Sequence, residues 1–402
     1  VPAYRPVELT DETLRDGLQS PSLVQPRIQD KVYLLYLMHD LGIQSVNVGL
    51  PAASAAMKYD CRVLAREIAH HGLALRPQCA GRTLKPDVEA IVEVAQWAGV
   101  EVEACLFIGS SPIRQYVEDW DLDTLLRLSE EAIACARNHG LPVTFITEDT
   151  TRARPETLRR LYTAAIDCGA SRLCLCDTVG HATPEGVRCL VSFVRQVVAE
   201  AGGEVKLDWH GHRDRGLSLA NALAAIAAGI DRVHATALGI GERSGNVPME
   251  ILLVNLKLLG LIDWDLTQLP EYCRVVAEAC QAPLPFNYPV AGDDAFRTAV
   301  GVHAAAIAKG LAKNDGWLAE RVYCSVPASM VGREQSIEIG PLSGAYNVRY
   351  WLRNHQIDVP EVVVDKILRA AKQAHRLLTE DEIMRIVVTM ERRMETLEGQ
   401  GT

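Results

Sequence analysis

The sequence predicts an α/β protein, a (β/α)8 barrel followed by a mostly helical C-terminal appendage. The first observation is that seven amphipathic stretches each end in a glycine, with 26 to 41 residues between successive glycines. Glycine is favoured just past a helix C-terminus because it accepts the left-handed backbone conformation. The glycines are Gly42, Gly72, Gly99, Gly140, Gly169, Gly203 and Gly229.

The second observation is a short apolar or β-prone run after each of these glycines and one before the first helix. The eight runs are Val7–Thr10, Ser45–Val48, Ala74–Arg76, Glu103–Ile108, Val143–Ile146, Arg172–Cys176, Val205–Leu207 and Arg232–Ala235. Between them apolar residues recur at helical spacing, as in Val32, Leu35 and Met38. Eight strand–helix units of such even length favour a closed TIM barrel over a doubly wound open sheet.

The barrel is expected to close near Gly260, which gives a catalytic domain over residues 1–262. The remaining residues, 263–402, are predicted to form the helical appendage. Pro283–Pro289 is typical of a linker, Ala295–Leu311 is predicted to be a helix of small residues, and Val362–Met394 a charged helix.

Composition limits the function classes. Of the 402 residues, 48% are hydrophobic and 23% charged, which excludes a disordered chain. The net charge of −10 argues against a nucleic-acid partner, because binding to backbone phosphates needs a basic face. No apolar run reaches the roughly 18 residues of a membrane helix. Eleven scattered cysteines without metal-type pairs predict reduced thiols in a cytoplasmic enzyme.

Polar residues follow the predicted strands, where the active site of a barrel lies. His210 and His212 are two residues apart, so in an extended segment both imidazoles can reach one divalent ion. Asp16 follows the first strand and Asn246 follows the eighth, and strands 7, 8 and 1 are neighbours in a closed barrel. The four side chains predict a divalent metal site, against the alternative of two solvated loop histidines.

Three further side chains at this edge are candidates for the chemistry. Arg15 can stabilise an enolate or alkoxide as it forms, or it can make an ion pair at the barrel mouth. Glu148 can hold a water or a substrate group, with the same structural alternative. Thr178 can donate its hydroxyl to a carboxylate, or it can cap the next helix.

Together these segments resemble the metal-dependent acyltransferase and lyase superfamily that includes 2-isopropylmalate synthase, homocitrate synthase, citramalate synthase and HMG-CoA lyase. The resemblance runs from Leu9 to about Gly344. It rests on several motifs in order, which are Thr13-Leu-Arg-Asp-Gly17, Leu50-Pro-Ala-Ala-Ser54, Glu148-Asp149, Asp177-Thr-Val-Gly180, His210-Gly-His212 and Gly239-Ile-Gly-Glu-Arg-Ser-Gly-Asn246.

The resemblance implies a role for each candidate at the barrel mouth. The cation would be Mg²⁺, Mn²⁺, Zn²⁺ or Co²⁺, and its ligands would be Asp16, His210 and His212, completed by Asn246. Arg15 would stabilise the developing enolate or oxyanion. Substrate contacts would come from Gln19, Glu148 and Thr178.

In the synthases of this superfamily, a helical subdomain after the barrel brings a Gly-Ile-His motif over the active site of the partner protomer. The corresponding motif here reads Gly301-Val-His303, so the resemblance implies that His303 is the acid/base residue. Tyr323 matches the tyrosine near the same site. A homodimer with shared active sites follows from the resemblance, whereas a histidine on an ordinary helix face is the alternative.

Three features of the sequence bear on the choice between the synthase and the lyase. Leu18 stands where synthases usually carry Glu and gives the lyase's spelling of the motif. The lyase, however, needs a cysteine in the loop after strand 8, and no cysteine occurs between Cys189 and Cys273. The lyase also lacks the long appendage. We therefore expect a synthase, with a lyase or a non-catalytic oxo-acid-binding regulator as alternatives.

The expected reaction is a Claisen condensation of acetyl-CoA with a 2-oxo acid in amino-acid biosynthesis. Thr144 and Ile146 stand where homocitrate synthases carry residues for a distal carboxylate, and neither can pair with one. Ala80 stands where isopropylmalate-type enzymes have Leu. Asn47 replaces a usual Glu, which makes the cavity less negative and puts a standard substrate in doubt. A neutral apolar oxo acid is favoured, with 2-oxoisovalerate as the default and a larger branched or aromatic one such as phenylpyruvate as the alternative.

Overall fold

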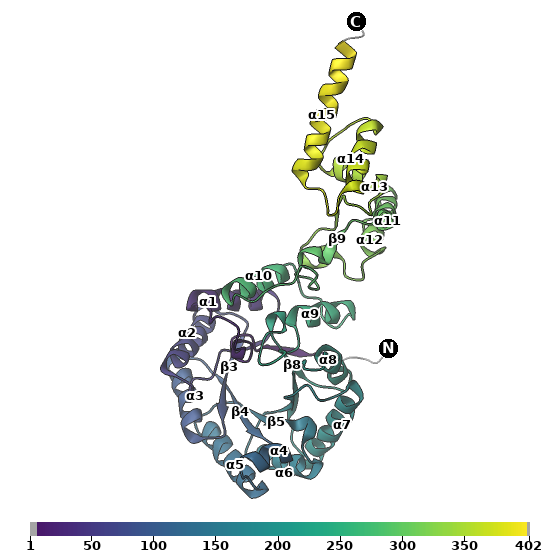
Figure 1. Cartoon of the computed structure of the whole chain (residues 1–402). Helices are drawn as coiled ribbons and strands as arrows, with labels where there is room; N and C mark the ends of the chain where they lie inside the picture. The colour runs from purple at the N-terminus through teal and green to yellow at the C-terminus, as the bar shows by residue number, and fades with distance from the viewer. Residues whose placement is uncertain (1–5, 400–402) are drawn as a thin grey trace. The chain divides into compact units, whose positions relative to one another are not determined.

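The computed structural model describes residues 6–399 and confirms the barrel, because eight parallel strands close in chain order (Figure 1). β1 pairs with both β2 and β8, which closes the sheet, and helices surround the strands. The strands are β1 Glu8–Asp11, β2 Ser45–Asn47, β3 Arg76–Arg82, β4 Glu103–Gly109, β5 Val143–Glu148, β6 Arg172–Asp177, β7 Lys206–Gly211 and β8 Arg232–Ala235.

One helix or more follows each strand. The barrel helices are α1 Ile28–Asp40, α2 Ala55–His71, α3 Lys85–Ala98, α4 Pro112–Val117, α5 Leu122–Asn138, α6 Pro155–Asp167, α7 Pro184–Ala201, α8 Ser218–Ala227, α9 Met249–Leu258 and α10 Leu269–Ala279. Among residues 6–399, no helix combines the length and the apolar content needed to cross a membrane.

The third strand lies later than the predicted Ala74–Arg76. After α2 the chain turns, with the backbone N–H of Leu75 donating to the carbonyl of Leu73, and β3 starts only at Arg76. The polar side chains of β3 conceal it from a search for apolar runs. Likewise α7 ends at Gly202, whose φ is 73°, and not at the predicted Gly203.

The barrel unit extends past the predicted boundary at residue 262. The chain divides into two compact units between Pro283 and Leu284, at the start of the predicted linker. Helix α10 belongs to the first unit because the hydroxyl of Tyr272 contacts the Asp11 carboxylate, at the end of β1, and lies 3.3 Å from the Thr13 hydroxyl. Sequence patterns cannot reveal such a long-range contact.

The second unit is mostly helical, as expected. It contains α11 Gly301–Ala312, α12 Gly316–Arg321, α13 Ala345–Asn354, α14 Glu361–Gln373, α15 Glu380–Gly399 and the paired strands β9 Arg297–Thr298 and β10 Ser336–Ile337. The predicted helix Ala295–Leu311 is shorter at its start because β9 precedes it. The predicted helix Val362–Met394 is two helices, because Thr379 and Glu382 cap the start of α15 reciprocally.

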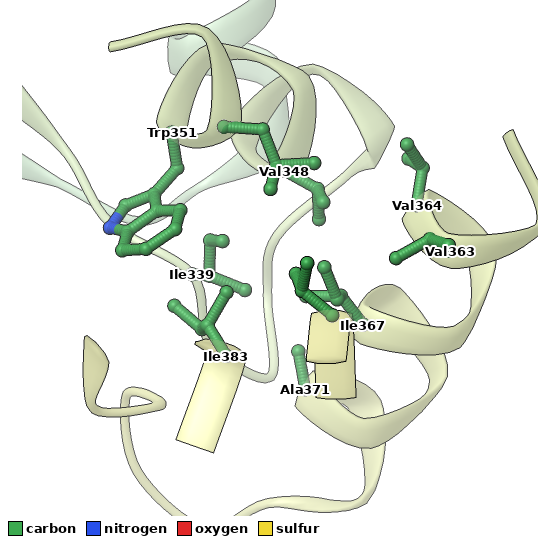
Figure 2. Close-up of a cluster of buried hydrophobic side chains, with 10 residues drawn as sticks. Ile339, Val348, Trp351, Val363, Val364, Ile367, Ala371 and Ile383 are labelled. Atoms are coloured by element: carbon green, nitrogen blue, oxygen red, sulfur yellow. The ribbon is translucent and has the colours of Figure 1, made fainter. Parts of the chain in front are cut away.

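The second unit has its own apolar core, where α13, α14 and α15 meet (Figure 2). We expect Ile367→Val, which removes one buried methyl group from this core, to lower the free energy of unfolding by about 0.5–1.5 kcal/mol. The matched control is Val362→Ala on the same helix, where the side chain is 50% exposed. Denaturant unfolding followed by circular dichroism measures both, and equal effects would contradict a packed core here.

Candidate active site and metal centre

A cavity of about 180 Å³ opens where the barrel strands end. Most side chains selected from the sequence line it: Arg15, Asp16, Gln19, Asn47, Ala80, Ile146, Glu148, Thr178, His210 and His212. Asn246 contacts Asp16 and so belongs to the same cluster. Thr144 lies deeper in the barrel, next to Arg232. His303 and Tyr323 belong to the second unit.

Asp16 is the centre of the predicted metal site. Its Oδ2 lies 3.2 Å from Nε2 of His210 and 3.6 Å from Nε2 of His212. His210 is on β7, which extends beyond its predicted end, and the backbone of His212 forms a bridge with Asn246. The side-chain amide of Asn246 donates to Oδ1 of Asp16 at 3.1 Å. The structure therefore brings all four predicted ligands together.

The donor set fits a divalent cation. Burial, followed by the neighbouring His210, lowers the pKa of His212 to about 4, so its imidazole is neutral at pH 7 and has a lone pair to donate. The Oδ1 of Asn246 and the Nδ1 of His212 are buried without hydrogen-bond partners. Gly241 lets the loop after β8 pass over this cluster, because its φ is 147° and a Cβ there would lie 3.2 Å from Oδ1 of Asp16.

Arg15 and Glu148 flank the cluster. Nη1 of Arg15 lies 3.2 Å from Oδ2 of Asp16. The Arg15 side chain is 18% exposed and lines the cavity. Glu148 ends β5, and burial raises its pKa although the positive charges of Arg114 and Arg15 oppose the shift. The site therefore offers one fixed cation and one carboxyl that protonates more easily than usual.

Thr178 and Gln19 occupy the loops after β6 and β1. The hydroxyl of Thr178 accepts from the backbone N–H of Asp149 at 2.8 Å, which supports Asp149 at its positive φ of 58°. The alternative capping role belongs to Thr183, whose hydroxyl accepts from the N–H of Gly186 at the start of α7. Gln19 is exposed at the end of the 3₁₀ turn Gly17–Gln19.

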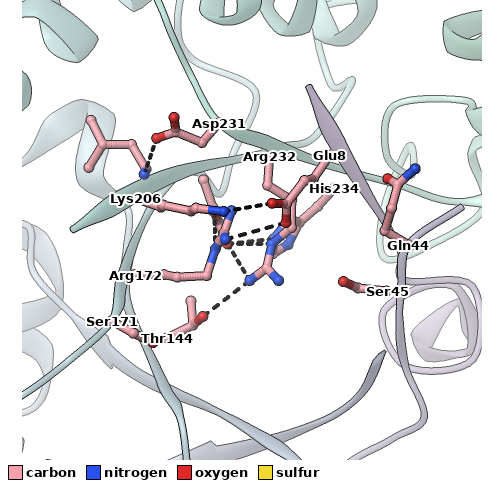
Figure 3. Close-up of polar contacts among 12 residues, drawn as sticks. Glu8, Gln44, Ser45, Thr144, Ser171, Arg172, Lys206, Asp231, Arg232 and His234 are labelled. Atoms are coloured by element: carbon pink, nitrogen blue, oxygen red, sulfur yellow. Dashed lines mark hydrogen bonds and ion pairs between the residues drawn. The ribbon is translucent and has the colours of Figure 1, made fainter. Parts of the chain in front are cut away.

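Thr144 does not line the cavity, contrary to expectation. It is fully buried and belongs to an ion network inside the barrel, where its hydroxyl lies 3.1 Å from Arg232 (Figure 3). The same hydroxyl also contacts Glu103. Thr144 points inward like Ile146, but it lies one layer deeper than the residues in the cavity wall. Of the two β5 residues in the argument against a second carboxylate, only Ile146 therefore lines the cavity.

A carboxylate lies beside Asn47 although position 47 itself carries none. Oε1 of Glu12, the residue that follows β1, is 3.4 Å from Nδ2 of Asn47. The expectation of a less negative cavity therefore stays a prediction.

His303 and Tyr323 lie against each other in the second unit. Their ring centroids are 4.0 Å apart, and Nδ1 of His303 is 3.5 Å from the hydroxyl of Thr298. His303 is on the first turn of α11, and Tyr323 is 50% exposed. The pair presents an imidazole and a phenol on one surface of that unit.

Several cavity residues were not selected from the sequence. Phe107, Cys174, Cys176 and His234 line the cavity, and Glu12 lies behind it. Alternation along each strand is the signal that identifies them, because every second residue of a barrel strand points inward. Cys174, Cys176 and His234 share the inward phase with predicted residues on their own or neighbouring strands.

Comparisons with known proteins agree with this geometry. The HMGL-like family matches residues 6–276, so the chain belongs to the HMGL-like family. It is 32% identical to homocitrate synthase AksA of Methanopyrus kandleri, over 92% of this chain and 89% of that protein. It is 31% identical to a protein of Ignicoccus hospitalis named "Probable 2-isopropylmalate synthase", over 95% and 91% of the two chains.

Solved structures share the fold. HMG-CoA lyase of Bacillus subtilis superposes with a TM-score of 0.58 at 21% identity, over 70% of this chain and 96% of that one. The matched part of this chain is close in size to the barrel unit.

Proposed function

We propose that the protein is an acyltransferase that condenses acetyl-CoA with a 2-oxo acid to give a 2-substituted malate and CoA. One observation carries the proposal: Asp16, His210 and His212 converge beside Arg15 in a single cavity at the ends of the strands. The relatives named homocitrate synthase and 2-isopropylmalate synthase support it.

A divalent cation held by Asp16, His210 and His212, with Asn246 beside them, supplies Lewis-acid chemistry at the cavity. The chain's own groups do the rest. A base removes a proton from the acetyl methyl group, and the resulting carbanion bonds to the ketone carbon while the C=O π electrons move to oxygen. The protonated base returns its proton to this alkoxide, and water hydrolyses the thioester to a carboxylate and free CoA. Arg15 presents charged N–H groups where negative charge develops on oxygen. Glu148 and Thr178 line the same cavity, and in this proposal they contact the oxo acid.

The base in this proposal is His303 of a partner copy, with Tyr323 beside it. An imidazole titrates near neutral pH and suits the removal of a proton from carbon. Helices α11 and α12, which precede Tyr323, also carry exposed apolar residues, including Val302 at 68% and Trp317 at 65% exposure. A surface of this composition is typical of one that another chain covers.

To test this dimer, His303→Ala subunits are mixed with Arg15→Ala subunits, both of which should be inactive. Mixed dimers contain one site with an intact barrel and an intact partner His303, so we expect activity to return. Subunit exchange is verified with differently tagged chains. A monomer in solution, or exchange without recovery, would contradict a shared site.

The oxo acid is proposed to carry a neutral apolar side chain. Ala80, Leu50, Phe107 and Ile146 form an apolar part of the cavity wall, and burying an unpaired carboxylate against them is unfavourable. Thiol release from acetyl-CoA across a panel of 2-oxo acids at equal concentration tests the function. Turnover with 2-oxoisovalerate or phenylpyruvate supports it. Cleavage of an acyl-CoA without an oxo acid would indicate a lyase. The absence of any reaction, with every oxo acid and with the acyl-CoA alone, would favour a non-catalytic regulator.

Ala80→Leu should shift this preference toward smaller oxo acids. Three added carbons fill part of the cavity, and each methylene of lost burial is worth about 0.8 kcal/mol. We therefore expect kcat/KM for phenylpyruvate to fall at least about tenfold relative to that for pyruvate. An unchanged ratio would mean that Ala80 does not contact the substrate side chain.

A further inference from the structure

Glu12 is a buried carboxylate that contacts three side chains of the cavity wall. It follows β1 directly, and its side chain is 1% exposed. Its Oε2 accepts from Nε of Arg15 at 2.7 Å. Its Oε1 lies 3.1 Å from Nδ1 of His234 and 3.4 Å from Nδ2 of Asn47. Each carboxylate oxygen therefore holds a different part of the wall.

His234 connects Glu12 to the interior of the barrel. Its Nε2 lies 3.3 Å from Asp208, so both ring nitrogens face carboxylates. Burial favours the neutral ring, but Cys174 and the carboxylates of Asp208 and Glu12 raise the pKa of His234 to about 10. His234 is thus a cation at neutral pH, and both of its N–H groups are occupied.

The network continues below His234 (Figure 3). The carboxylate of Asp208 accepts from Nε of Arg172 and from Nε of Arg232, each at 2.8 Å. Nη1 of Arg232 donates to Oε2 of Glu103 at 3.0 Å. All four side chains are at least nine-tenths buried. The interior of a TIM barrel is usually filled by branched apolar residues, whereas this one contains a network of ion pairs. Glu12 is the member of the network that contacts the cavity wall.

Arg15 lies between two carboxylates. Nε and Nη2 contact Glu12, and Nη1 lies 3.2 Å from Asp16. If Glu12 were neutral, Nε and Nη2 would lose their carboxylate partner, and the guanidinium would keep only its existing contact with Asp16 and could rotate about it. Glu12 therefore determines which way Arg15 faces.

We propose that Glu12 is the positioning residue that fixes Arg15 beside the metal ligands for the proposed condensation. The inference rests on the proposed function for its kinetic test only. The proposal also predicts that a carboxylate introduced at position 47 can take over the role of Glu12. Because a glutamate is one methylene longer than an asparagine, Glu at position 47 can place its carboxylate where that of Glu12 lies now, next to Nδ2 of Asn47.

The experiment compares Glu12→Gln, Glu12→Thr and the double variant Glu12→Thr/Asn47→Glu. For the single variants we expect kcat to fall about 10–100-fold, as for other partners that orient a functional group. KM for the oxo acid and the Kd of Mn²⁺, measured by calorimetry, should change less than about threefold. The double variant should recover at least about tenfold over Glu12→Thr. Glu89→Gln, on an exposed part of α3, is the control.

A second measurement does not require turnover. The ¹⁵N–¹H resonance of the Arg15 Nε–H, assigned by its loss in Arg15→Lys, should be slow to exchange in the native protein and in the double variant. In Glu12→Gln it should broaden or disappear. Native kcat in Glu12→Gln, parallel loss of Mn²⁺ affinity, or a folded double variant without recovery would overturn the proposal. If wild-type protein shows no condensation, the resonance still decides the role of Glu12, so failure of the two proposals is distinguishable.

Discussion

Removing divalent cations should abolish turnover, and adding Mg²⁺, Mn²⁺, Zn²⁺ or Co²⁺ should restore it. The reason is the cluster of Asp16, His210 and His212, whose ligand atoms all lie within 4.8 Å of one another. Arg15 is the cation within 4 Å of Asp16, and a bound divalent ion polarises a ketone more strongly than a guanidinium does. The measurement is thiol release after dialysis against a chelator and after readdition of each ion.

The variant His212→Ala connects this loss to the cluster. It removes one of three ligands and should weaken Mn²⁺ binding by more than the 10–100-fold that is typical when only an outer partner of a metal ligand is lost. His139→Ala, an exposed position after α5, is the matched control and should bind normally. Full turnover of metal-stripped protein, or of metal-stripped His212→Ala, would contradict a metal-dependent reaction.

The barrel could be predicted because its signals are local. A glycine after a helix and the short run that follows depend only on neighbouring residues, and these positions repeat along the chain. β3 and the extent of the first unit could not be predicted in the same way. β3 begins and ends with an exposed arginine and holds the buried polar Gln78, so it lacks an apolar pattern. Helix α10 joins the barrel through the contact of Tyr272 with Asp11.

In the candidate site, too, the residues that could be predicted are those with local sequence signals. Asp16, His210 and His212 could be predicted because neighbouring strands end at one edge and residues two apart share a face. Glu12 and His234 could not, because their significance lies in a contact across the closing pair of strands. β1 and β8 run side by side with Thr10 opposite His234, and nothing in the linear sequence sets that register. The prediction for Thr144 is wrong for a related reason, because alternation along a strand indicates that its side chain points inward but not how deep in the barrel it lies.

Arg15→Lys should lower kcat by about 10²–10³, the usual loss when one donor to a developing oxyanion is removed. The guanidinium contacts Glu12 through Nε and Nη2 and Asp16 through Nη1, so one planar group satisfies two carboxylates at once. A lysine ammonium keeps the charge but has a single nitrogen and no planar fork. It can pair with one carboxylate only, and it then no longer faces the position where negative charge develops.

This expectation separates a catalytic arginine from a structural ion pair at the barrel mouth. In the catalytic case kcat falls while the Kd of Mn²⁺ and the midpoint of thermal unfolding stay close to native, because the positive charge next to Asp16 is retained. In the structural case the melting midpoint falls and kcat per folded molecule stays near native. Arg188→Lys, on the outer face of α7 at 51% exposure, controls for the substitution itself. Near-native turnover of Arg15→Lys would assign Arg15 to the structural role and remove the oxyanion donor from the proposed mechanism.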